Sequence, residues 1–546
     1  MDGETVKANS ELSAEEKQAL RDEKKRLKEA EKAAKALKKA EEAAAAESAA
    51  AEYLKMTSGI EYLSLDDEPK QKYGSYKLVQ SLVDGSGRSF TPLESLSALK
   101  ANENLWIRAR VSTIRSKGRS AFLVLRQMRA TVQGLVSEDD SKGIDKNMIK
   151  WIGKEVTPES IIDIYGTIVE ASVLSCSVKD VEIHVERLYL VSKADSPLPF
   201  VLEDAARPAS DTSGAHVLRD TRLNYRVLDL RVPSHKAILR LQAAVSSLFR
   251  DHLSAEGFIE IHSPKLIGGA SEGGANVFTL DYFGAPACLA QSPQLYKQMA
   301  ICADFEKVYE VAPVFRAENA NTHRHLTEFI GLDMEMMIDE HYYEVIRALD
   351  AMFVAIFDGL AQKFKKDLET IQAQYPFEPI KYKSARQNLI LTFAEGVKML
   401  RDAGYTLGDY EDLNTELERA LGALVKEKYD TDFFFLSRFP SAVRPFYTMP
   451  APDDSNYSNS FDVFIRGEEI VSGAQRIHDA SMLEISAQNH GIDVETIRDY
   501  VNAFKYGAPP HGGAGVGLER VVMLYLAIGN VREACLFPRD PKRLAP

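Results

Sequence analysis

Hydrophobic and polar residues follow several distinct patterns along the chain. Residues 11–52 are mostly alanine, lysine and glutamate, which predicts a helix that stays in solvent rather than burying a face. Between residues 104 and 190, apolar and polar positions alternate in short stretches, and this period of two predicts antiparallel strands. Residues 237–252 have apolar positions at helical spacing, and 258–264 follow as a predicted strand that ends at Pro264.

A strand, a loop and a second strand are predicted over residues 308–337. In the second strand, even-numbered positions are large and apolar, whereas odd-numbered positions mix aromatic, glycine and acidic residues. Because side chains alternate across a strand, the two sets lie on opposite faces. The even set is expected to join the core (Ile330, Leu332, Met334 and Met336), and the odd set to floor a ligand site (Phe329, Gly331, Asp333 and Glu335).

Near the C-terminus, a glycine-rich stretch at 512–520 is expected to be a turn that delivers Arg520 onto an apolar helix. Its spacing matches neither the dinucleotide-binding nor the P-loop pattern, so another phosphate-handling fold is indicated. Residues 462–469 are expected to form a hairpin with its turn at Arg466-Gly467.

Length and composition limit the possible classes. The 546 residues suffice for about three domains. No apolar run approaches the roughly 20 residues that a bilayer requires. The four cysteines show no paired spacing and the first residues lack a secretory pattern, so a cytoplasmic protein that makes no membrane contact is expected.

The charge is distributed unevenly. The net charge of −13 argues against nonspecific nucleic-acid binding by the whole surface. Residues 24–39, which include Lys24 and Lys28, oppose this sign with a net charge of +6. An arm that grips RNA phosphates and a plain solvated helix with i,i+4 ion pairs explain this segment about equally well.

Several stretches closely resemble the signature motifs of class II aminoacyl-tRNA synthetases. Arg316, within 314–318, and Arg520 resemble the arginines of the second and third motifs, and the strand that ends at Pro264 resembles the first. The words at 291–297, QSPQLYK, resemble the aspartyl enzymes specifically. The similarity runs from about residue 100 to the end, so the chain is identified as a member of the eukaryotic-type, cytoplasmic aspartyl-tRNA synthetases.

The resemblance implies an α+β protein in which a helical extension and an OB-fold barrel precede a class II catalytic domain, an antiparallel sheet flanked by helices. The expected parts are an extension (1–75), an anticodon-binding barrel (76–205), a hinge (206–235) and the catalytic domain (236–546), with an insertion at about 342–446 that carries no chemical motif. Such an enzyme joins L-aspartate to its tRNA through an aspartyl-adenylate and releases pyrophosphate and AMP. No general base stands out, so positioning and charge are expected to supply the catalysis.

The resemblance also assigns residues to the ATP site. Arg316 would grip the α-phosphate, Phe329 would stack on adenine, and Arg520 would lie opposite and reach the γ-phosphate. Glu318 and Glu469 complete the ATP set, and Arg316, Arg520 and Glu469 are the expected catalytic residues.

Mg²⁺ is expected on Asp462 and Glu469 by the same resemblance. Strand parity complicates this assignment, because Glu469 is odd-numbered whereas Ser472, a proposed aspartate contact, is even-numbered. Either a bulge, for which Gly473 is the candidate position, brings both to one face, or Glu468 takes the role instead.

The expected aspartate site combines a helix, the floor strand and a lid. Ser292 could cap the helix and Pro293 suits its first turn, and the spacing of three then places Gln294 and Lys297 on one face. A lysine in an otherwise neutral pocket favours a second carboxylate over an amide. The remaining members, implied by the resemblance, are Ser271 and Glu272 in the lid, Asp333, Ser472 and Arg476.

The barrel and the dimer interface are assigned by resemblance as well. Phe122 would stack on an anticodon base, and three polar residues (Gln133, Ser175 and Glu182) would touch base edges. Phe122 could instead be barrel core, a frequent place for a strand phenylalanine. Pro264 would lie at the contact of a homodimer.

Three other functions remain open. An asparaginyl or non-discriminating enzyme would differ in its choice of amino acid or tRNA, although Lys297 disfavours the first. A non-catalytic tRNA-binding scaffold would have lost a phosphate arginine, and both are present. An amidating ligase would have little use for an anticodon-type barrel.

Overall fold

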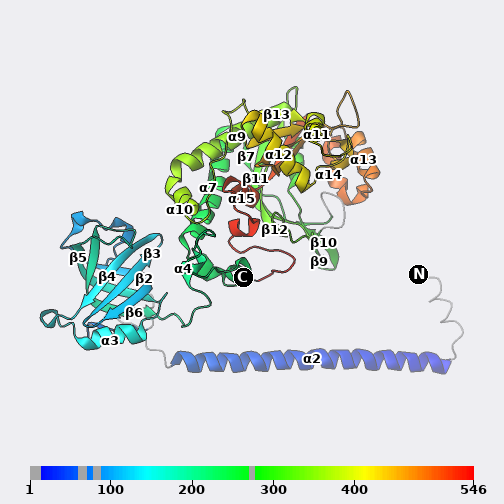
Figure 1. Ribbon diagram of the computed structural model, residues 1–546. Coiled ribbons are helices and arrows are strands. Elements are labelled where there is room, and N and C mark those ends of the chain that lie inside the picture. The colour runs from blue at the N-terminus through cyan, green and yellow to red at the C-terminus, as the bar shows by residue number, and fades with distance from the viewer. Residues whose placement is uncertain (1–13, 59–70, 78–87, 270–276, 546) are drawn as a thin grey trace. The chain divides into compact units, whose positions relative to one another are not determined.

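The computed structural model describes residues 14–58, 71–77, 88–269 and 277–545. The chain divides into two compact units, residues 1–197 and 198–546 (Figure 1). Within the described ranges, no helix is both long and apolar enough to cross a membrane. The four cysteines are free thiols, and none of them forms a disulfide.

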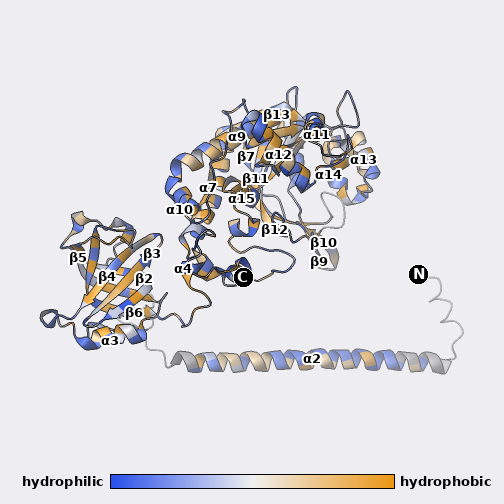
Figure 2. Ribbon diagram, viewed as in Figure 1, coloured by the Kyte–Doolittle hydropathy of each residue, from blue (hydrophilic) through white to orange (hydrophobic). Residues whose placement is uncertain are grey.

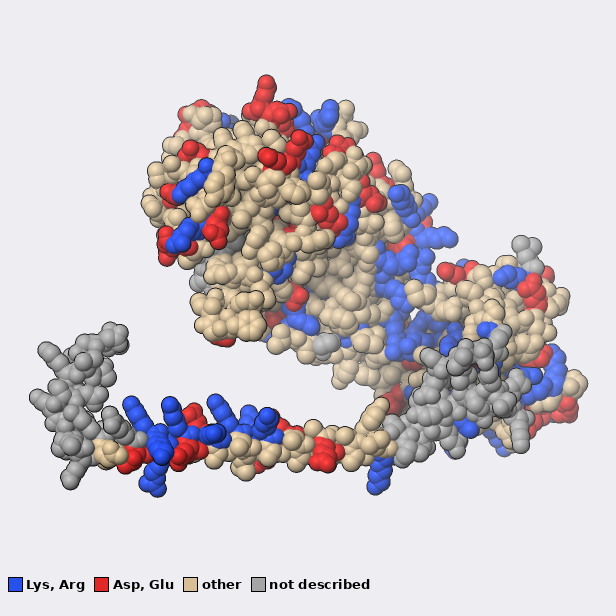
Figure 3. Space-filling view, turned by 180° about the vertical axis from the view of Figure 1, so that it is seen from behind, with Lys and Arg blue, Asp and Glu red and all other residues tan. Residues whose placement is uncertain are grey.

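The first unit begins with helix α2 (Ala14–Ser58), 45 residues long. Its described side chains are exposed, and hydropathy colouring shows polar and weakly apolar residues mixed around it (Figure 2). Figure 3 shows its basic and acidic side chains interspersed along its length. The solvated helix predicted from composition is confirmed, because alanine, lysine and glutamate favour the helix but leave it no face to bury.

The remainder of the first unit is a β-barrel. Its strands are β1 (Tyr73–Ser75), β2 (Asn104–Lys117), β3 (Ser120–Gln127), β4 (Ala130–Ser137), β5 (Ile161–Glu170) and β6 (Val181–Ser192), and α3 (Lys146–Glu155) lies between β4 and β5 in sequence. The strand order is β1-β6-β4-β3-β2-β5, and β5 also pairs with β6, which closes the barrel. Alternate residues such as Ile107, Leu123 and Leu125 fill the interior and are fully buried. The predicted OB-fold is therefore present.

The second unit is built on an eight-stranded sheet. Its strands are β7 (Ile259–Glu260), β11 (Lys307–Phe315), β12 (Glu328–Met337), β13 (Leu389–Thr392), β14 (Phe433–Ser437), β15 (Ser460–Ile465), β16 (Glu468–Gln475) and β17 (His511–Gly517). They lie in the order β13-β14-β15-β16-β17-β12-β11-β7. Neighbours are antiparallel except at the two edges, where β13 and β7 run parallel to their partners.

Helices and a small second sheet surround this framework. The helices are α4 (Leu202–Ala205), α5 (Arg219–Asn224), α6 (Arg226–Asp229), α7 (Pro233–Ala255), α8 (Gln294–Cys302), α9 (Tyr343–Lys363), α10 (Lys365–Gln372), α11 (Phe393–Asp402), α12 (Thr415–Tyr429), α13 (Ala480–Asn489), α14 (Arg498–Lys505) and α15 (Leu518–Tyr525). The small sheet contains β8 (Leu266–Ile267), β9 (Thr279–Tyr282) and β10 (Ala285–Leu289).

The main core lies between one face of the large sheet and helices α7, α9 and α15. Leu332, Met334 and Met336 of β12 belong to this core, as the alternation predicted. Phe329, Gly331 and Asp333 face a cavity on the opposite side. The period-two pattern thus identified both faces of this strand, because a central strand has no third environment for its side chains.

The glycine-rich stretch expected as a turn is instead the central strand β17, so that expectation was wrong. Its glycines pair with β12 on one side and with β16 on the other. A Cβ at Gly513 would overlap the Met334 carbonyl and the Glu335 carboxylate. The glycines therefore serve close packing between neighbouring strands rather than a change of chain direction.

Three other segments differ from expectation. The strand expected over 258–264 is only the two residues of β7. The segment expected as a hinge, 206–235, is folded into the second unit, where Arg222 pairs with Glu533 at 3.1 Å. The segment 342–446, expected as an insertion, contributes β13 and β14 to the large sheet. Polar and proline-rich composition therefore did not mark a free linker here.

Candidate active site

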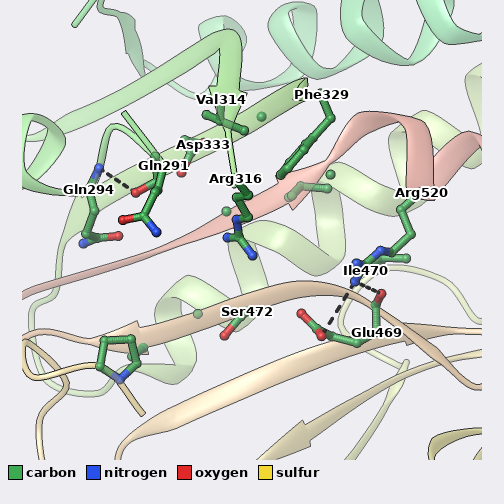
Figure 4. A pocket seen from close by; sticks show the side chains of 18 of the residues that line it. Gln291, Gln294, Val314, Arg316, Phe329, Asp333, Glu469, Ile470, Ser472 and Arg520 are labelled. Carbon is green, nitrogen blue, oxygen red and sulfur yellow. Dashed lines mark hydrogen bonds and ion pairs between the residues drawn. The ribbon is translucent and has the colours of Figure 1, made fainter. Parts of the chain in front are cut away.

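A cavity of about 410 Å³ opens on the face of the large sheet opposite the core helices. Residues from β11, β12, β16 and β17 line it together with the start of α15. Figure 4 shows Arg316 and Arg520 pointing into this one space, with Phe329 beside them. Two cations and an aromatic surface thus lie together, although Arg316 and Arg520 are 204 positions apart in the chain.

Arg316 and Phe329 form one wall of the cavity. The guanidinium carbon of Arg316 lies 5.7 Å from the centroid of the Phe329 ring, within cation–π range. Glu318 is 4.0 Å from Arg316 and also lines the cavity. The Phe329 ring lies beside Arg316 and lines the cavity (Figure 4).

Arg520 enters from the first turn of α15. Its guanidinium donates hydrogen bonds to the carbonyl oxygens of Glu469, at 3.0 Å, and Arg324, at 3.4 Å. The Glu469 carboxylate lies 3.7 Å away. These contacts fix the direction of the guanidinium while its side chain remains 22% exposed, so it can still bind an anion.

The other end of the cavity is lined by Gln294, Asp333, Ser472 and Arg476. Behind them, Lys297 is 2% exposed and its Nζ lies 3.2 Å from Asp333 and 3.3 Å from Glu335. The expectation of a lysine in otherwise neutral surroundings was therefore wrong. Two carboxylates already contact this lysine.

Glu335 connects the two cations at this end. It is fully buried, and Arg476 donates to both of its carboxylate oxygens, at 2.8 and 3.1 Å. Burial alone would raise the pKa of Glu335, but Arg476 and Lys297 outweigh it and hold that pKa below its ordinary value. The carboxylate is therefore ionised and fixes both cations in position. The alternation of residues in the sequence predicted that Glu335 lies on the cavity side of β12, but it assigned no function to this residue.

A bulge resolves the parity conflict in β16. Val463 pairs with Val471 and Phe464 pairs with Glu469, so Ile470 has no partner on β15. The bulge is at Ile470 rather than at Gly473, and it turns Glu469 and Ser472 to the same face, where both line the cavity. Glu468 points elsewhere and binds His323 at 3.0 Å and Arg419 at 2.7 Å.

Asp462 and Glu469 lie close enough to influence each other. Burial raises the pKa of Asp462 to about 7; the nearby Arg444 lowers it and the Glu469 charge raises it. Arg444 contacts Asp462 at 2.9 Å and donates to Ser472 at 2.7 Å. Two neighbouring carboxylates suit a hard divalent cation. Within the described ranges no group of three His, Cys, Asp or Glu residues could hold a metal, so phosphate oxygens would have to complete the shell.

The helix that carries Gln294 and Lys297 begins one residue later than expected. Pro293 is its N-cap rather than part of its first turn. Ser292 therefore precedes the N-cap, so its expected position as the cap was wrong, although its hydroxyl accepts a hydrogen bond from the Gln294 amide at 3.2 Å. Ser271 and Glu272, expected to form a lid, lie outside the described residues.

Several cavity residues were not assigned from the sequence, namely Gln291, Arg324, His325, Arg444 and Glu519. Burial and the charge of Arg520 lower the pKa of His325, so its imidazole is neutral at pH 7. The sequence could have pointed to His325, because this residue lies in the loop between the two predicted strands that carry Arg316 and Phe329. The buried Glu519 directly precedes Arg520, but only its environment singles it out.

The barrel surface brings together three of its four predicted residues. Phe122 is 37% exposed and faces outward, so the alternative that it is barrel core is wrong. Its neighbouring positions across the sheet are Leu135 and, beyond it, His184. In the adjacent row, Gln133 donates to Glu182 at 2.7 Å. Ser175 is exposed in the loop between β5 and β6.

The three residues that carry the remaining predictions are all exposed. Pro264 lies on the surface between β7 and β8, and Lys24 and Lys28 lie on the solvated face of α2. Exposure is compatible with a dimer contact and with phosphate binding, respectively, and their roles remain predictions.

Residues 218–541 match the family model of class II tRNA synthetases (D, K and N). This match covers more than half of the chain, and with the sheet and its two arginines it places the chain in the class II tRNA synthetase family, in the branch of the aspartate–tRNA ligases. The cytoplasmic aspartate–tRNA ligase of Homo sapiens is 50% identical over 486 residues, which is 88% of this chain and 96% of the relative. The cytoplasmic aspartate–tRNA ligase 1 of Arabidopsis thaliana is 51% identical over 498 residues, 89% of this chain and 92% of that protein.

Solved structures agree with this placement. An aspartyl-tRNA synthetase from Entamoeba histolytica matches with a TM-score of 0.79 at 44% identity, covering 89% of this chain and 98% of that chain. An asparaginyl-tRNA synthetase from Pyrococcus horikoshii, complexed with asparaginyl-adenylate, matches with a TM-score of 0.71 at 27% identity, over 84% of this chain and 100% of that chain.

Proposed function

We propose that this protein attaches L-aspartate to its tRNA at the expense of ATP, with aspartyl-adenylate as the intermediate. The observation that carries this proposal is the convergence of Arg316, Arg520 and Phe329 on one cavity whose other end holds Arg476, with Lys297 behind it. One end suits a nucleoside triphosphate and the other a small dicarboxylate. The family and its aspartate-specific relatives agree with this division.

In the first step, a carboxylate oxygen of aspartate attacks the α-phosphorus of ATP, and the bond to pyrophosphate breaks. Two anions must approach one another, so cations have to offset the repulsion and hold them in line. Arg316 would hold the α-phosphate with adenine on Phe329, and Arg520 would hold the γ-phosphate. Glu318 would contact the nucleotide from the Arg316 side.

In the second step, the terminal ribose hydroxyl of the tRNA attacks the carbonyl carbon of the adenylate. The new ester forms, AMP leaves, and the hydroxyl proton is lost. We assign no residue as the base for that proton, and we attribute the rate acceleration mainly to orientation and to charge stabilisation.

The amino-acid end accounts for the preference for aspartate. Gln294, Asp333 and Ser472 would orient its polar groups, and Lys297 and Arg476 would bind its carboxylates. Glu335 and Asp333 already balance these two positive charges, so we assign the preference to hydrogen bonding. Lys297 and Arg476 are donors only, and a carboxylate accepts from both, whereas the NH2 of an amide would face a donor. Ser271 and Glu272 are proposed to close over the bound amino acid.

Asp462 and Glu469 are proposed to hold Mg²⁺ together with phosphate oxygens. When bound there, the ion would offset the charge of the triphosphate. The ion pair with Arg444 holds the Asp462 carboxylate in position at this site.

Recognition of the tRNA is proposed to involve the barrel and helix α2, which both belong to the first unit. Phe122 would stack on an anticodon base, while Gln133, Ser175 and Glu182 contact base edges. Lys24 and Lys28 of α2 would add phosphate contacts. We further propose a homodimer with Pro264 at its contact, acting in the cytoplasm as the names of the relatives state for those proteins.

The test is exchange of labelled pyrophosphate into ATP by the purified protein, with aspartate, asparagine or no amino acid. We expect exchange with aspartate only, followed by charging of aspartate tRNA and not of asparagine tRNA. Equal exchange with asparagine would refute the proposed specificity, and no exchange with either would refute the proposed reaction.

A further inference from the structure

Helix α12, from the segment that the sequence left without a role, reaches the wall of the active-site cavity. It contacts β16, and Gly422 lies directly against Gly467 in the turn between β15 and β16. A Cβ on Gly422 would overlap the backbone of Gly467, so only glycine permits this approach. The glycine contact fixes the position of the preceding helical turn, which carries Glu418 and Arg419.

Glu418 is 5% exposed and joins two separate parts of the cavity wall. Its carboxylate pairs with Arg324 at 2.6 Å and 3.4 Å, and it accepts a hydrogen bond from the backbone amide of Glu469 at 3.4 Å. Arg324 belongs to the loop between β11 and β12, whereas Glu469 belongs to β16. One side chain therefore holds two segments that approach the cavity from different directions.

Arg520 binds the same two residues from inside the cavity. Its guanidinium donates to the carbonyl oxygens of Glu469 and Arg324. The contacts close a ring that runs from Glu418 to Arg324, from Arg324 to Arg520, from Arg520 to Glu469 and back to Glu418. Whatever moves Glu418 shifts the two acceptors that set the direction of Arg520.

Arg419 makes a parallel connection one residue further along. It donates to Glu468 at 2.7 and 3.0 Å, and Glu468 contacts His323 at 3.0 Å. Glu418 thus contacts Arg324 in the loop and Glu469 in β16, and Arg419 contacts the preceding residues of the same two segments, His323 and Glu468. Two adjacent connections resist both sliding and rotation of the loop, which a single ion pair would not do.

We infer that Glu418 is a positioning residue for the first step of the reaction, acting from α12 through Arg324 and Glu469 to aim Arg520 at the phosphates of ATP. It lies outside the cavity lining and does not touch the substrates. This inference rests on the proposed function, and it gives the 342–446 segment a part in that function.

The test uses the full-length protein and aspartate-dependent pyrophosphate exchange. In Glu418→Gln, an oxygen acceptor remains but the charge that binds Arg324 is lost, so we expect the KM for ATP to rise about tenfold or more. The KM for aspartate should stay within about twofold, because the Lys297 and Arg476 network does not include Glu418. Glu427→Gln, an exposed position on the same helix, is the matched control and should match the wild type.

Removal of one partner of a buried pair can also destabilise the fold. The double variant Glu418→Gln with Arg324→Gln relieves the unpaired charge, and we expect it to melt closer to the wild type than Glu418→Gln does, with the KM for ATP still raised. An unchanged KM for ATP in folded Glu418→Gln would overturn the inference, as would equal increases for ATP and aspartate. A wild-type protein without exchange would instead overturn the proposed function.

Discussion

At the scale of single residues, the shape of the Arg520 side chain should matter as much as its charge. The planar guanidinium donates to two carbonyls at once and still faces the cavity. Lysine carries the same charge as a single point and does not reproduce that fork. We expect Arg520→Lys to reduce kcat/KM for ATP in pyrophosphate exchange by about 100-fold, while tRNA binding is unchanged.

Arg498→Lys on the exposed surface of α14 is the matched control, because this side chain is 63% exposed and lies outside the cavity lining. Near-normal exchange in Arg520→Lys would mean that positive charge alone suffices. The assigned contact with the γ-phosphate would then lose its geometric basis.

Glu519 predicts a dependence of stability on pH. It is 4% exposed and bonds to the Ile330 amide and to Gln242, and burial raises its pKa from 4.5 to about 7. The folded state therefore binds this proton more tightly than the unfolded state does. The stabilising contribution is complete below about pH 4.5 and is lost as the pH rises through 7.

Glu519→Gln keeps an oxygen acceptor for Ile330 and removes the titration. As the pH is raised from 5 to 8, the stability of the variant relative to the wild type should increase by roughly 2.5 kcal/mol, because the wild type loses up to about 1.4 kcal/mol per pH unit between the two pKa values. Urea unfolding of both proteins at the two pH values measures this difference. The same gap at both pH values would show that Glu519 does not titrate in this range.

At the scale of elements, β17 shows why the centre of the sheet is rich in glycine. A side chain at Gly513 would push against Glu335, which holds Lys297 and Arg476. Gly513→Ala should cost about 3 kcal/mol in unfolding free energy and raise the KM for aspartate. Gly529→Ala has open space at its Cβ and should change neither the urea midpoint nor that KM.

The sequence revealed those elements whose pattern is local. The alternation in β12 was sufficient to place Leu332 in the core and Asp333 on the cavity side. The glycines of β17 were misread as a turn, because glycine permits both a turn and a tightly packed strand, and only the neighbouring strands decide between them. Glu418 had no sequence signal at all, since its partners Arg324 and Glu469 are 94 and 51 residues away.

At the scale of the whole molecule, the sequence separated the helical extension, the barrel and the sheet domain, but it misjudged what joins them. The polar segment 206–235 looked like a hinge, yet Arg226 donates to the Leu536 carbonyl from inside the second unit. The composition of a segment indicates how well its side chains are solvated, but it does not show whether residues far away in the sequence bind them. The boundary between the compact units is at residues 197 and 198 instead.

The last prediction concerns the contribution of the N-terminal extension to tRNA binding. Helix α2 exposes Lys24 and Lys28 on a protein whose net charge is −13, so its basic residues can attract phosphates only locally. Deletion of residues 1–60 should weaken tRNA binding about tenfold at low salt and make the remaining affinity less sensitive to salt, because fewer counterions are released. Pyrophosphate exchange should be unchanged, since the cavity lies in the other unit.

Replacing the eight basic residues of 24–39 by glutamine in the full chain should have the same effect on tRNA binding if charge is the cause. If binding and its salt dependence survive both changes, the helix is only a solvated extension.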